Sequence, residues 1–120
     1  MSVTVRITKS FLSAVKPLLK KYPSLSKDLL QLEKVLLDHP KHGTPLGHNL
    51  YKIRLKISSK GKGKSGGARI ISLVETTIIG ELQVVDGDIT VNLITIYDKA
   101  ETAAISDKEL KDLIKSFYQQ

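Results

Sequence analysis

Basic side chains alternate with apolar ones along the segment "KIRLK" at residues 52–56. Side chains of a β-strand point to opposite faces in turn, so this spacing predicts a strand with three cations on one face. Arg69 stands at the start of the next apolar run, "ARIISLV", which is predicted to be a neighbouring strand. Cations gathered on one face of a sheet are suited to holding phosphate groups and to stabilising charge that develops on them.

A loop rich in glycine and lysine, "SKGKGKSGG", joins these two predicted strands. Its glycine spacing resembles that of a dinucleotide-binding turn, but such a turn must open a helix, whereas Gly66 precedes a strand. A P-loop would need glycine at position 58, which is Ser58. We therefore predict a flexible hairpin tip that contacts a long groove of phosphates, although a solvated turn beside an edge strand is the simpler alternative. The cations of this tip are Lys60, Lys62 and Lys64.

Charge is distributed unevenly along the 120 residues, whose formal net charge is +7. Residues 39–74 contain eight Lys or Arg and no acid, whereas residues 75–120 contain four Lys or Arg and nine acids. Such segregation favours a polyanionic partner over an evenly solvated surface. An anionic membrane is the weaker option, because no amphipathic basic helix with Trp or Phe accompanies the cations.

Composition narrows the protein class further. The hydrophobic content of 41% is ordinary for a globular domain, and the absence of cysteine excludes a disulfide scaffold and thiol chemistry. No apolar stretch is long enough to cross a bilayer, and the first residues lack the apolar block of a signal peptide. We therefore expect a soluble, cytoplasmic protein.

The three histidines all fall in one segment, "HPKHGTPLGHN". His39 and His42 are not a helical metal pair, because Pro40 breaks the helix and no cysteine or carboxylate accompanies them as a further ligand. We expect neither a metal nor a cofactor. His48, just before the cationic strand, is predicted to contact a phosphate or a base, with a solvated loop histidine as the alternative.

Hydrophobic periodicity predicts one α+β domain spanning residues 1–120. Its expected architecture is an antiparallel-dominated sheet packed by an N-terminal helical hairpin, plus a C-terminal helix. A capping box formed by Ser106 and Glu109 is expected at the start of that C-terminal helix. The predicted strands cover residues 2–8, 50–58, 68–85 (one long or two short strands) and 89–98. The predicted helices cover residues 9–23, 24–40 and 106–120.

Some positions sharpen these predictions. Pro17 predicts a kink or a late start in the first helix. Residues 39–49 are predicted to be loop because they are rich in Gly, Pro and Asn. Leu50 and Tyr51 are assigned to the apolar side of the strand that follows, and the near-continuous apolar run over 89–98 predicts an interior strand.

The segments "LGHNLYKIRLKISSKGKGKSGGARII", "LITIYDKAE" and "ISDKELKDLIK" resemble the RelE/HigB-type toxins of bacterial type II toxin–antitoxin modules. The resemblance implies a RelE-like fold and a small ribosome-dependent endoribonuclease that cuts mRNA in the decoding site. It also implies a cognate antitoxin that inhibits the toxin in a hetero-oligomeric complex.

The resemblance extends to individual site residues. The cationic strand of the family matches Lys52, Arg54 and Lys56, and its arginine early in the next strand matches Arg69. Arg69 is expected to hold the phosphoryl oxygens, because its planar fork suits bidentate contacts. Lys52 and Arg54 would hold the flanking phosphates or the departing oxygen. The residues expected to bind RNA are Lys56, Lys60, Lys62, Lys64 and His48.

The basic residue that follows the last strand of the family matches Lys99, beside Tyr97. Lys99 or Lys52 is expected to take part in proton transfer. Tyr97 is expected to stack on a base or to orient one. The alternative is that Tyr97 is only the last core-facing side chain of an apolar strand.

Two other functions stay open at this level. A ParE-like relative would poison DNA gyrase on the same fold, but it needs no cationic catalytic cluster. A non-catalytic RNA-binding module, such as a decayed toxin, stays open because "KAETAAIS" at residues 99–106 has neither the aromatic residue nor the arginine that the family often has there.

Overall fold

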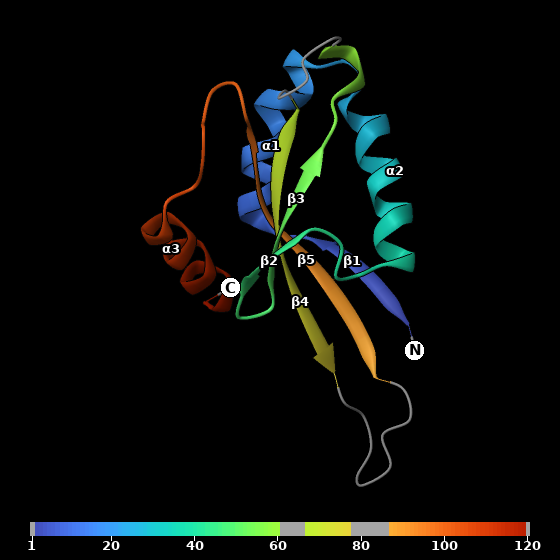
Figure 1. Cartoon of the computed structure of the whole chain (residues 1–120), viewed down its shortest axis with the longest axis vertical. Coiled ribbons are helices and arrows are strands. Elements are labelled where there is room, and N and C mark those ends of the chain that lie inside the picture. Colours follow the sequence, from blue (N-terminus) through green and yellow to red (C-terminus); the bar gives the residue numbers. More distant parts are fainter. Residues whose placement is uncertain (1, 61–66, 78–86, 120) are drawn as a thin grey trace, which may run out of the picture.

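The computed structural model describes residues 2–60, 67–77 and 87–119. In this part of the chain, five strands form one mixed sheet in the order β1-β5-β4-β3-β2 (Figure 1). β1 runs parallel to β5, and the three other neighbouring pairs are antiparallel, which confirms the predicted antiparallel-dominated sheet. The strands are β1 (Val3–Ile7), β2 (Thr44–Gly47), β3 (Leu50–Leu55), β4 (Ala68–Thr77) and β5 (Asp88–Asp98).

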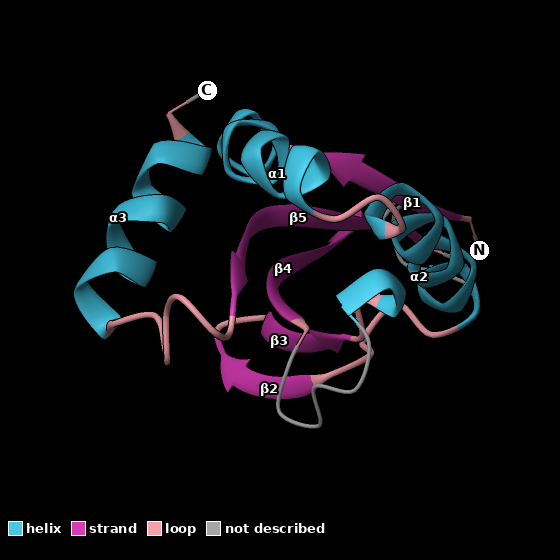
Figure 2. Ribbon diagram, turned by 90° about the horizontal axis from the view of Figure 1, so that it is seen from above, coloured by secondary structure: helices cyan, strands magenta, loops and turns pink. Residues whose placement is uncertain are grey.

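Helices pack on both faces of the sheet (Figure 2). α1 (Lys9–Lys21) and α2 (Leu25–Asp38) form the predicted N-terminal hairpin and cover one face, where the larger apolar core lies. α3 (Asp107–Tyr118) lies on the other face, where a smaller cluster forms. The smaller cluster contains Leu50, Ile71, Leu73, Ile94 and Phe117. This arrangement confirms the predicted α+β class and explains why β5 is apolar on both faces: it lies inside the sheet, with a cluster on each side.

α1 runs through Pro17 from Lys9 to Lys21, so the predicted late start is wrong. The helix begins earlier because the hydroxyl of Thr8 caps it by accepting a hydrogen bond from the Phe11 N–H at 3.2 Å. A proline inside a helix costs about 3 kcal/mol, but Phe11 before it and Leu18 after it are both buried against the core. Burying each such side chain stabilises by about 1.5–3 kcal/mol, which outweighs that cost.

The cap predicted for the C-terminal helix is confirmed. The Glu109 N–H donates to the Ser106 hydroxyl at 3.1 Å, and that hydroxyl donates to the Glu109 carboxylate at 3.2 Å. These bonds satisfy a backbone donor of the first turn and fix the Glu109 side chain beside the start of α3.

Residues 44–47 form β2, so the prediction of loop throughout 39–49 is wrong there. β2 pairs with β3 in an antiparallel hairpin whose turn residues, His48 and Asn49, both have positive φ. Positive φ at both central residues is the signature of a type I′ turn, which joins closely paired strands. Pro45 obscured the strand, but β2 is an edge strand, where a missing N–H is tolerated.

Leu50 was assigned to the wrong face of β3. Consecutive strand residues point to opposite faces, so Leu50 and Tyr51 cannot share one. Leu50 packs in the smaller cluster beneath α3, and Tyr51 packs against the larger core. The cationic face of β3 is therefore the α3 side of the sheet, with Leu50 at one end of it.

None of the helices in the described ranges is long and apolar enough to span a membrane.

Candidate active site

Three strands place side chains of the candidate site in one row. Arg54 on β3 pairs with Arg69 on β4, and Arg69 pairs with Tyr97 on β5. Directly opposite residues of antiparallel strands have Cβ atoms about 5 Å apart, so these side chains are immediate neighbours. Lys52 lies two residues before Arg54 on the same face and pairs with Thr44 of β2. The alternation predicted for β3 thus places two neighbouring cations, Lys52 and Arg54, on the same face of the sheet as Arg69.

A pocket of about 350 Å³ opens over these cations. Four of the predicted catalytic residues line it together, although they come from β3, β4 and the turn after β5. The fifth, Tyr97, lies in the next pocket along the row. The residues around the cationic pocket are His42, Gly43, Thr44, Lys52, Arg54, Arg69 and Lys99.

Arg69 is the buried cation of this group, with 7% of its surface exposed. Its Nη1 donates to the Ala68 carbonyl at 3.1 Å, and this is its one hydrogen bond to the part of the chain that the structure describes, although a guanidinium has five N–H donors. Within the described residues, no carboxylate forms an ion pair with Arg69, Arg54 or Lys52. Burying a charge without a partner is costly, and like charges directly opposite on two strands repel. An anion bound in the pocket would relieve both costs.

The backbone of the next turn holds Lys99 at the pocket. Its N–H donates to the Gly67 carbonyl at 3.1 Å, and its Nζ donates to the Ala103 carbonyl at 2.6 Å. Gly67 comes just before β4 with φ of +89°, and an added Cβ would clash with the Leu55 carbonyl oxygen. Glycine is therefore required at this position, where the chain approaches β3 closely and meets the turn that carries Lys99.

Two acidic residues of this turn connect it to α1. Asp98 is 2% exposed and accepts hydrogen bonds from the Tyr22 hydroxyl at 2.5 Å and from the Ala100 N–H at 2.9 Å. Glu101 pairs with Lys21 at 2.7 Å, and this hydrogen bond is the main reason that the pKa of Lys21 is raised above its ordinary value. The larger core thereby fixes the turn that positions Lys99.

A second glycine lets the segment before β2 approach the cationic strand. Gly43 has φ of +112°, and a Cβ at this position would lie 2.6 Å from the carbonyl oxygen of Lys52. Because only glycine fits here, His42 and Thr44 come close enough to line the pocket with Lys52.

Lys56 is predicted to bind RNA, but it does not line the cationic pocket. It follows the last residue of β3 and lies close enough to Asp28 of α2 to help keep that carboxylate ionised. Burial disfavours the ionised form of Asp28, yet the Ser58 and Ser24 hydrogen bonds and Lys56 together hold its pKa below the ordinary value. The Ser58 hydroxyl donates to Asp28 at 2.6 Å and the Ser58 N–H at 3.0 Å.

These bonds attach the short 3-10 turn η1 (Ser58–Lys60) to the start of α2. The Ser59 N–H also donates to the Ser24 hydroxyl at 2.7 Å. The base of the predicted glycine–lysine tip is therefore fixed to the helical hairpin. The predicted RNA contacts Lys62 and Lys64 lie outside the described residues, and Lys60 ends the turn just before them.

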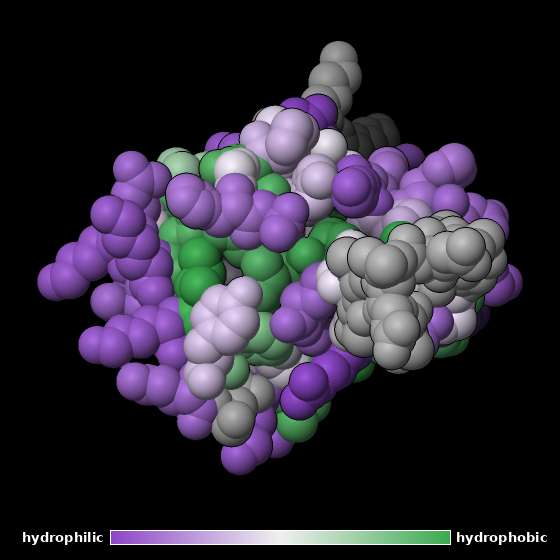
Figure 3. Space-filling model, turned by 90° about the horizontal axis from the view of Figure 1, so that it is seen from below, coloured by the Kyte–Doolittle hydropathy of each residue, from purple (hydrophilic) through white to green (hydrophobic). Residues whose placement is uncertain are grey.

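His48 lies apart from the cationic pocket. It is in the β2–β3 turn and lines a different hollow, of about 430 Å³, which lies between the β2–β3 hairpin and α3. The space-filling view in Figure 3 shows this hollow as an apolar area surrounded by polar side chains. The predicted RNA contact of His48 therefore does not belong to the same site as Lys52 and Arg69.

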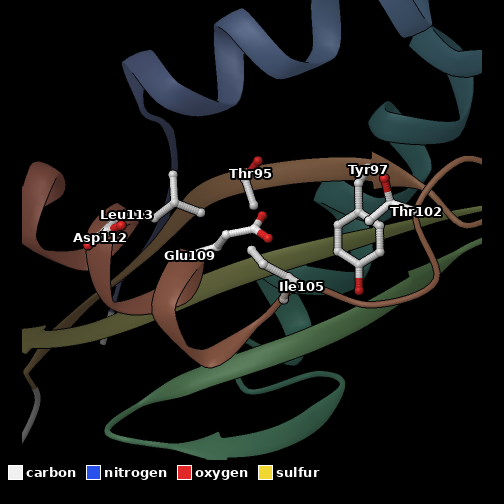
Figure 4. A pocket seen from close by; sticks show the side chains of 7 residues that line it. All are labelled: Thr95, Tyr97, Thr102, Ile105, Glu109, Asp112 and Leu113. Carbon is white, nitrogen blue, oxygen red and sulfur yellow. The ribbon is translucent and has the colours of Figure 1, made fainter.

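Tyr97 is half-buried and belongs to neither apolar cluster, which argues against a core-facing role. It lines a separate pocket between β5 and α3, shown in Figure 4. Because Tyr97 is the strand partner of Arg69, the two pockets are adjacent on one face of the sheet.

His42 is the candidate that sequence reasoning missed, because it was considered as a metal ligand and set aside. Its position at the pocket depends on β2, which places residues 42–44 beside Lys52. The signal was present in "GTPLGHNLYK", where His-Asn fills a two-residue hairpin turn and aligns Thr44 with Lys52.

The pocket combines phosphate-binding side chains with the imidazole of His42. Arginine and lysine bind phosphate oxygens, and an imidazole can accept or donate a proton near neutral pH. Over the described ranges, no three His, Asp or Glu side chains are grouped as a metal site would require.

A scan against protein-family models finds no match for this chain, and a search of curated proteins gives no significant match. The functional argument therefore depends on the geometry of the site.

Proposed function

We propose that this protein is a metal-independent endoribonuclease that cuts mRNA on the ribosome, as the toxin of a type II toxin–antitoxin module of RelE/HigB type. The observation that carries the proposal is the pocket in which Lys52, Arg54, Arg69 and Lys99 meet. No carboxylate pairs with the first three of them among the described residues. Cations arranged in this way match the charge of an RNA phosphate, and the 2′-hydroxyl of RNA supplies the nucleophile.

In the proposed reaction, the 2′-oxygen attacks the adjacent phosphorus while the bond from phosphorus to the 5′-oxygen breaks. The products are a 2′,3′-cyclic phosphate and a free 5′-hydroxyl, so atoms and charge balance. Negative charge grows on the non-bridging oxygens, where the Arg69 fork would donate two hydrogen bonds. Lys52 and Arg54 would neutralise the phosphate and its neighbour.

Two proton transfers complete the reaction, because the 2′-hydroxyl must lose a proton and the 5′-oxygen must gain one. We assign one transfer to His42, whose imidazole lines the pocket, and the other to Lys99 or Lys52. Lys99 is held by backbone contacts, so its ammonium has a fixed position at the pocket.

The proposal includes a partner. A cytoplasmic nuclease of this kind must be inhibited when it is not needed, and a cognate antitoxin with exposed carboxylates would compete with phosphate for the cations. Binding to the folded toxin alone would also raise its melting temperature by mass action.

Replacing Arg69 tests the proposal. Arg69→Ala should lower mRNA cutting by roughly 100- to 1,000-fold, the usual effect of losing one donor to a developing oxyanion. Arg69→Lys should recover little of this activity, because lysine keeps the charge but loses the bidentate fork. The measurement is inducible expression followed by mapping of mRNA 5′ ends, with Arg6→Ala on β1 as the control.

Unchanged cutting by a folded Arg69→Ala protein would contradict the role of Arg69. If the wild-type protein produced no cuts in translated codons, the nuclease proposal itself would be wrong. DNA damage without RNA cuts would then indicate a gyrase poison, and the absence of both effects would indicate a binding module.

The histidines provide a matched pair of variants. His42→Gln should slow cutting by roughly 100-fold or more, because positioned general acid–base groups contribute about 10²–10⁴-fold. His39→Gln should have no effect, since His39 lies three residues away and does not line the cationic pocket. Equal rates for the two variants, measured on ribosomes programmed with one mRNA, would exclude His42 from proton transfer.

A further inference from the structure

The pocket beside Tyr97 differs in chemistry from its cationic neighbour. It has a volume of about 380 Å³ and lies between β5 and the segment that leads into α3. Tyr97 and Thr95 line it from the strand, and Ile105 and Glu109 line it from the other side (Figure 4). Its size falls within the range of small-ligand sites, about 300–1,000 Å³. An aromatic ring, an apolar side chain, a hydroxyl and a carboxylate are the groups that would hold a flat, polar-edged ligand.

Glu109 has a fixed position in this pocket. Its backbone N–H and its carboxylate both bond to the Ser106 hydroxyl in the capping box of α3. Figure 4 shows the carboxylate directed from α3 toward the sheet, on the side where Thr95 lies. An ionised carboxylate accepts about four hydrogen bonds, and the contact with Ser106 uses one of them. Acceptor capacity therefore remains on the pocket side.

The two pockets are electrostatically opposite. The cationic pocket has four basic side chains, whereas this one has the carboxylates of Glu109 and Asp112 and no basic residue. A phosphate is attracted to the first pocket and repelled by the second. The row in which Arg69 pairs with Tyr97 joins them, so a single nucleotide could place its phosphate at Arg69 and its base at Tyr97.

We infer that this pocket is a nucleobase subsite that selects guanine in the RNA strand whose phosphate lies at Arg69; this inference rests on the proposed function. Tyr97 supplies the stacking surface, as aromatic side chains do for unstacked RNA bases. Glu109 supplies the selection. Guanine presents two N–H donors side by side, at N1 and N2, which match the two oxygens of a carboxylate. Uracil presents one such donor between two carbonyl oxygens, which a carboxylate repels.

The test is equilibrium binding, which requires no turnover. The probes are guanosine 3′,5′-bisphosphate and uridine 3′,5′-bisphosphate, whose phosphates are identical, and the measurement is calorimetric titration of the full chain. Guanosine bisphosphate should bind at least tenfold more tightly. Glu109→Gln should remove this preference, while helix α3 stays capped because glutamine also completes a capping box. Tyr97→Leu should weaken both probes by about tenfold or more, since stacking stabilises by about 1–3 kcal/mol per base.

Asp107→Asn is the matched control, because Asp107 is also an acidic residue of the first turn of α3 but lines a different pocket. The guanosine preference should persist in this variant. Equal affinities of the wild-type protein for both probes, or a preference that survives Glu109→Gln, would overturn the subsite. Such a result would leave cutting by the cationic pocket intact. Conversely, a guanosine preference in a protein that cuts no mRNA would support the subsite and contradict the nuclease.

Discussion

At the scale of single residues, Gly43 determines how closely the segment carrying His42 approaches Lys52. Alanine at this position would combine an unfavourable positive φ with a contact of 2.6 Å to the Lys52 carbonyl oxygen. We predict that Gly43→Ala lowers the free energy of unfolding by about 2–4 kcal/mol, because the strain of about 1–2 kcal/mol is joined by a backbone clash.

Gly47→Ala is the control for this prediction. Gly47 also has positive φ, of +89°, but no atom lies within 4 Å of an added Cβ. Its loss in unfolding free energy should be confined to the backbone strain of about 1–2 kcal/mol. Urea denaturation of both variants measures the difference, and equal losses would show that Gly43 is required for its φ alone.

Residue types predicted part of the candidate site, because strand alternation depends on local sequence. The period of two placed Lys52 and Arg54 on one face, and the structure adds Arg69 by pairing it with Arg54. His42 could not be found in this way. Its place depends on the register of a short edge strand, and no local periodicity reports that register.

At the scale of elements, Asp28 connects the loop base to the helical hairpin. We predict that Asp28→Asn lowers the free energy of unfolding by about 1 kcal/mol near pH 7, at the low end for hydrogen bonds to a charged group because the site is partly exposed. Asp38→Asn, at the opposite end of α2, should not destabilise the protein, because a carboxylate at a helix C-terminus is unfavourable.

The pH dependence of this effect has a definite sign. Because the pKa of Asp28 is lower in the folded state than its ordinary value of 3.8, the ionised carboxylate stabilises the fold. That stabilisation is present above the ordinary pKa and is lost as the pH falls through the lower pKa of the folded state. Unfolding free energies of the wild type and Asp28→Asn should therefore converge in acid. A difference that stayed constant from pH 7 to pH 3 would contradict this account.

The sequence predicted the long elements well and the short ones poorly. α1, α2 and α3 have apolar stripes that any packed arrangement would bury, and β5 has apolar side chains on both faces of the sheet. β2 has four exposed residues, including a proline, so it contributes no pattern. β2 forms because of tertiary structure: it pairs with β3 and so satisfies the backbone groups of β3 that would otherwise be unpaired at the edge of the sheet.

At the scale of the whole molecule, the α3 face of the sheet carries a cationic pocket beside an acidic one, and the helical hairpin supports the opposite face. A net charge of +7 attracts RNA from any direction, so affinity alone does not identify the binding surface. The binding surface can be identified from the number of phosphates that it neutralises. Every neutralised phosphate releases counterions and so contributes to the salt dependence of binding.

We therefore predict that the salt dependence of RNA binding depends on where charge is removed and not only on how much. For a single strand, the slope of log K against log salt is about −0.7 per phosphate contact. Removing Lys52 and Arg54 together by alanine substitution should make the slope shallower by about 1.4. Removing Lys16 and Lys20, which are exposed on α1, changes the net charge equally and should leave the slope unaltered. Fluorescence anisotropy with a 2′-O-methylated single strand, which cannot be cut, measures binding from 50 to 200 mM KCl. If both double variants lost the same slope, RNA would be held by net charge alone, and the cationic pocket would not be its binding site.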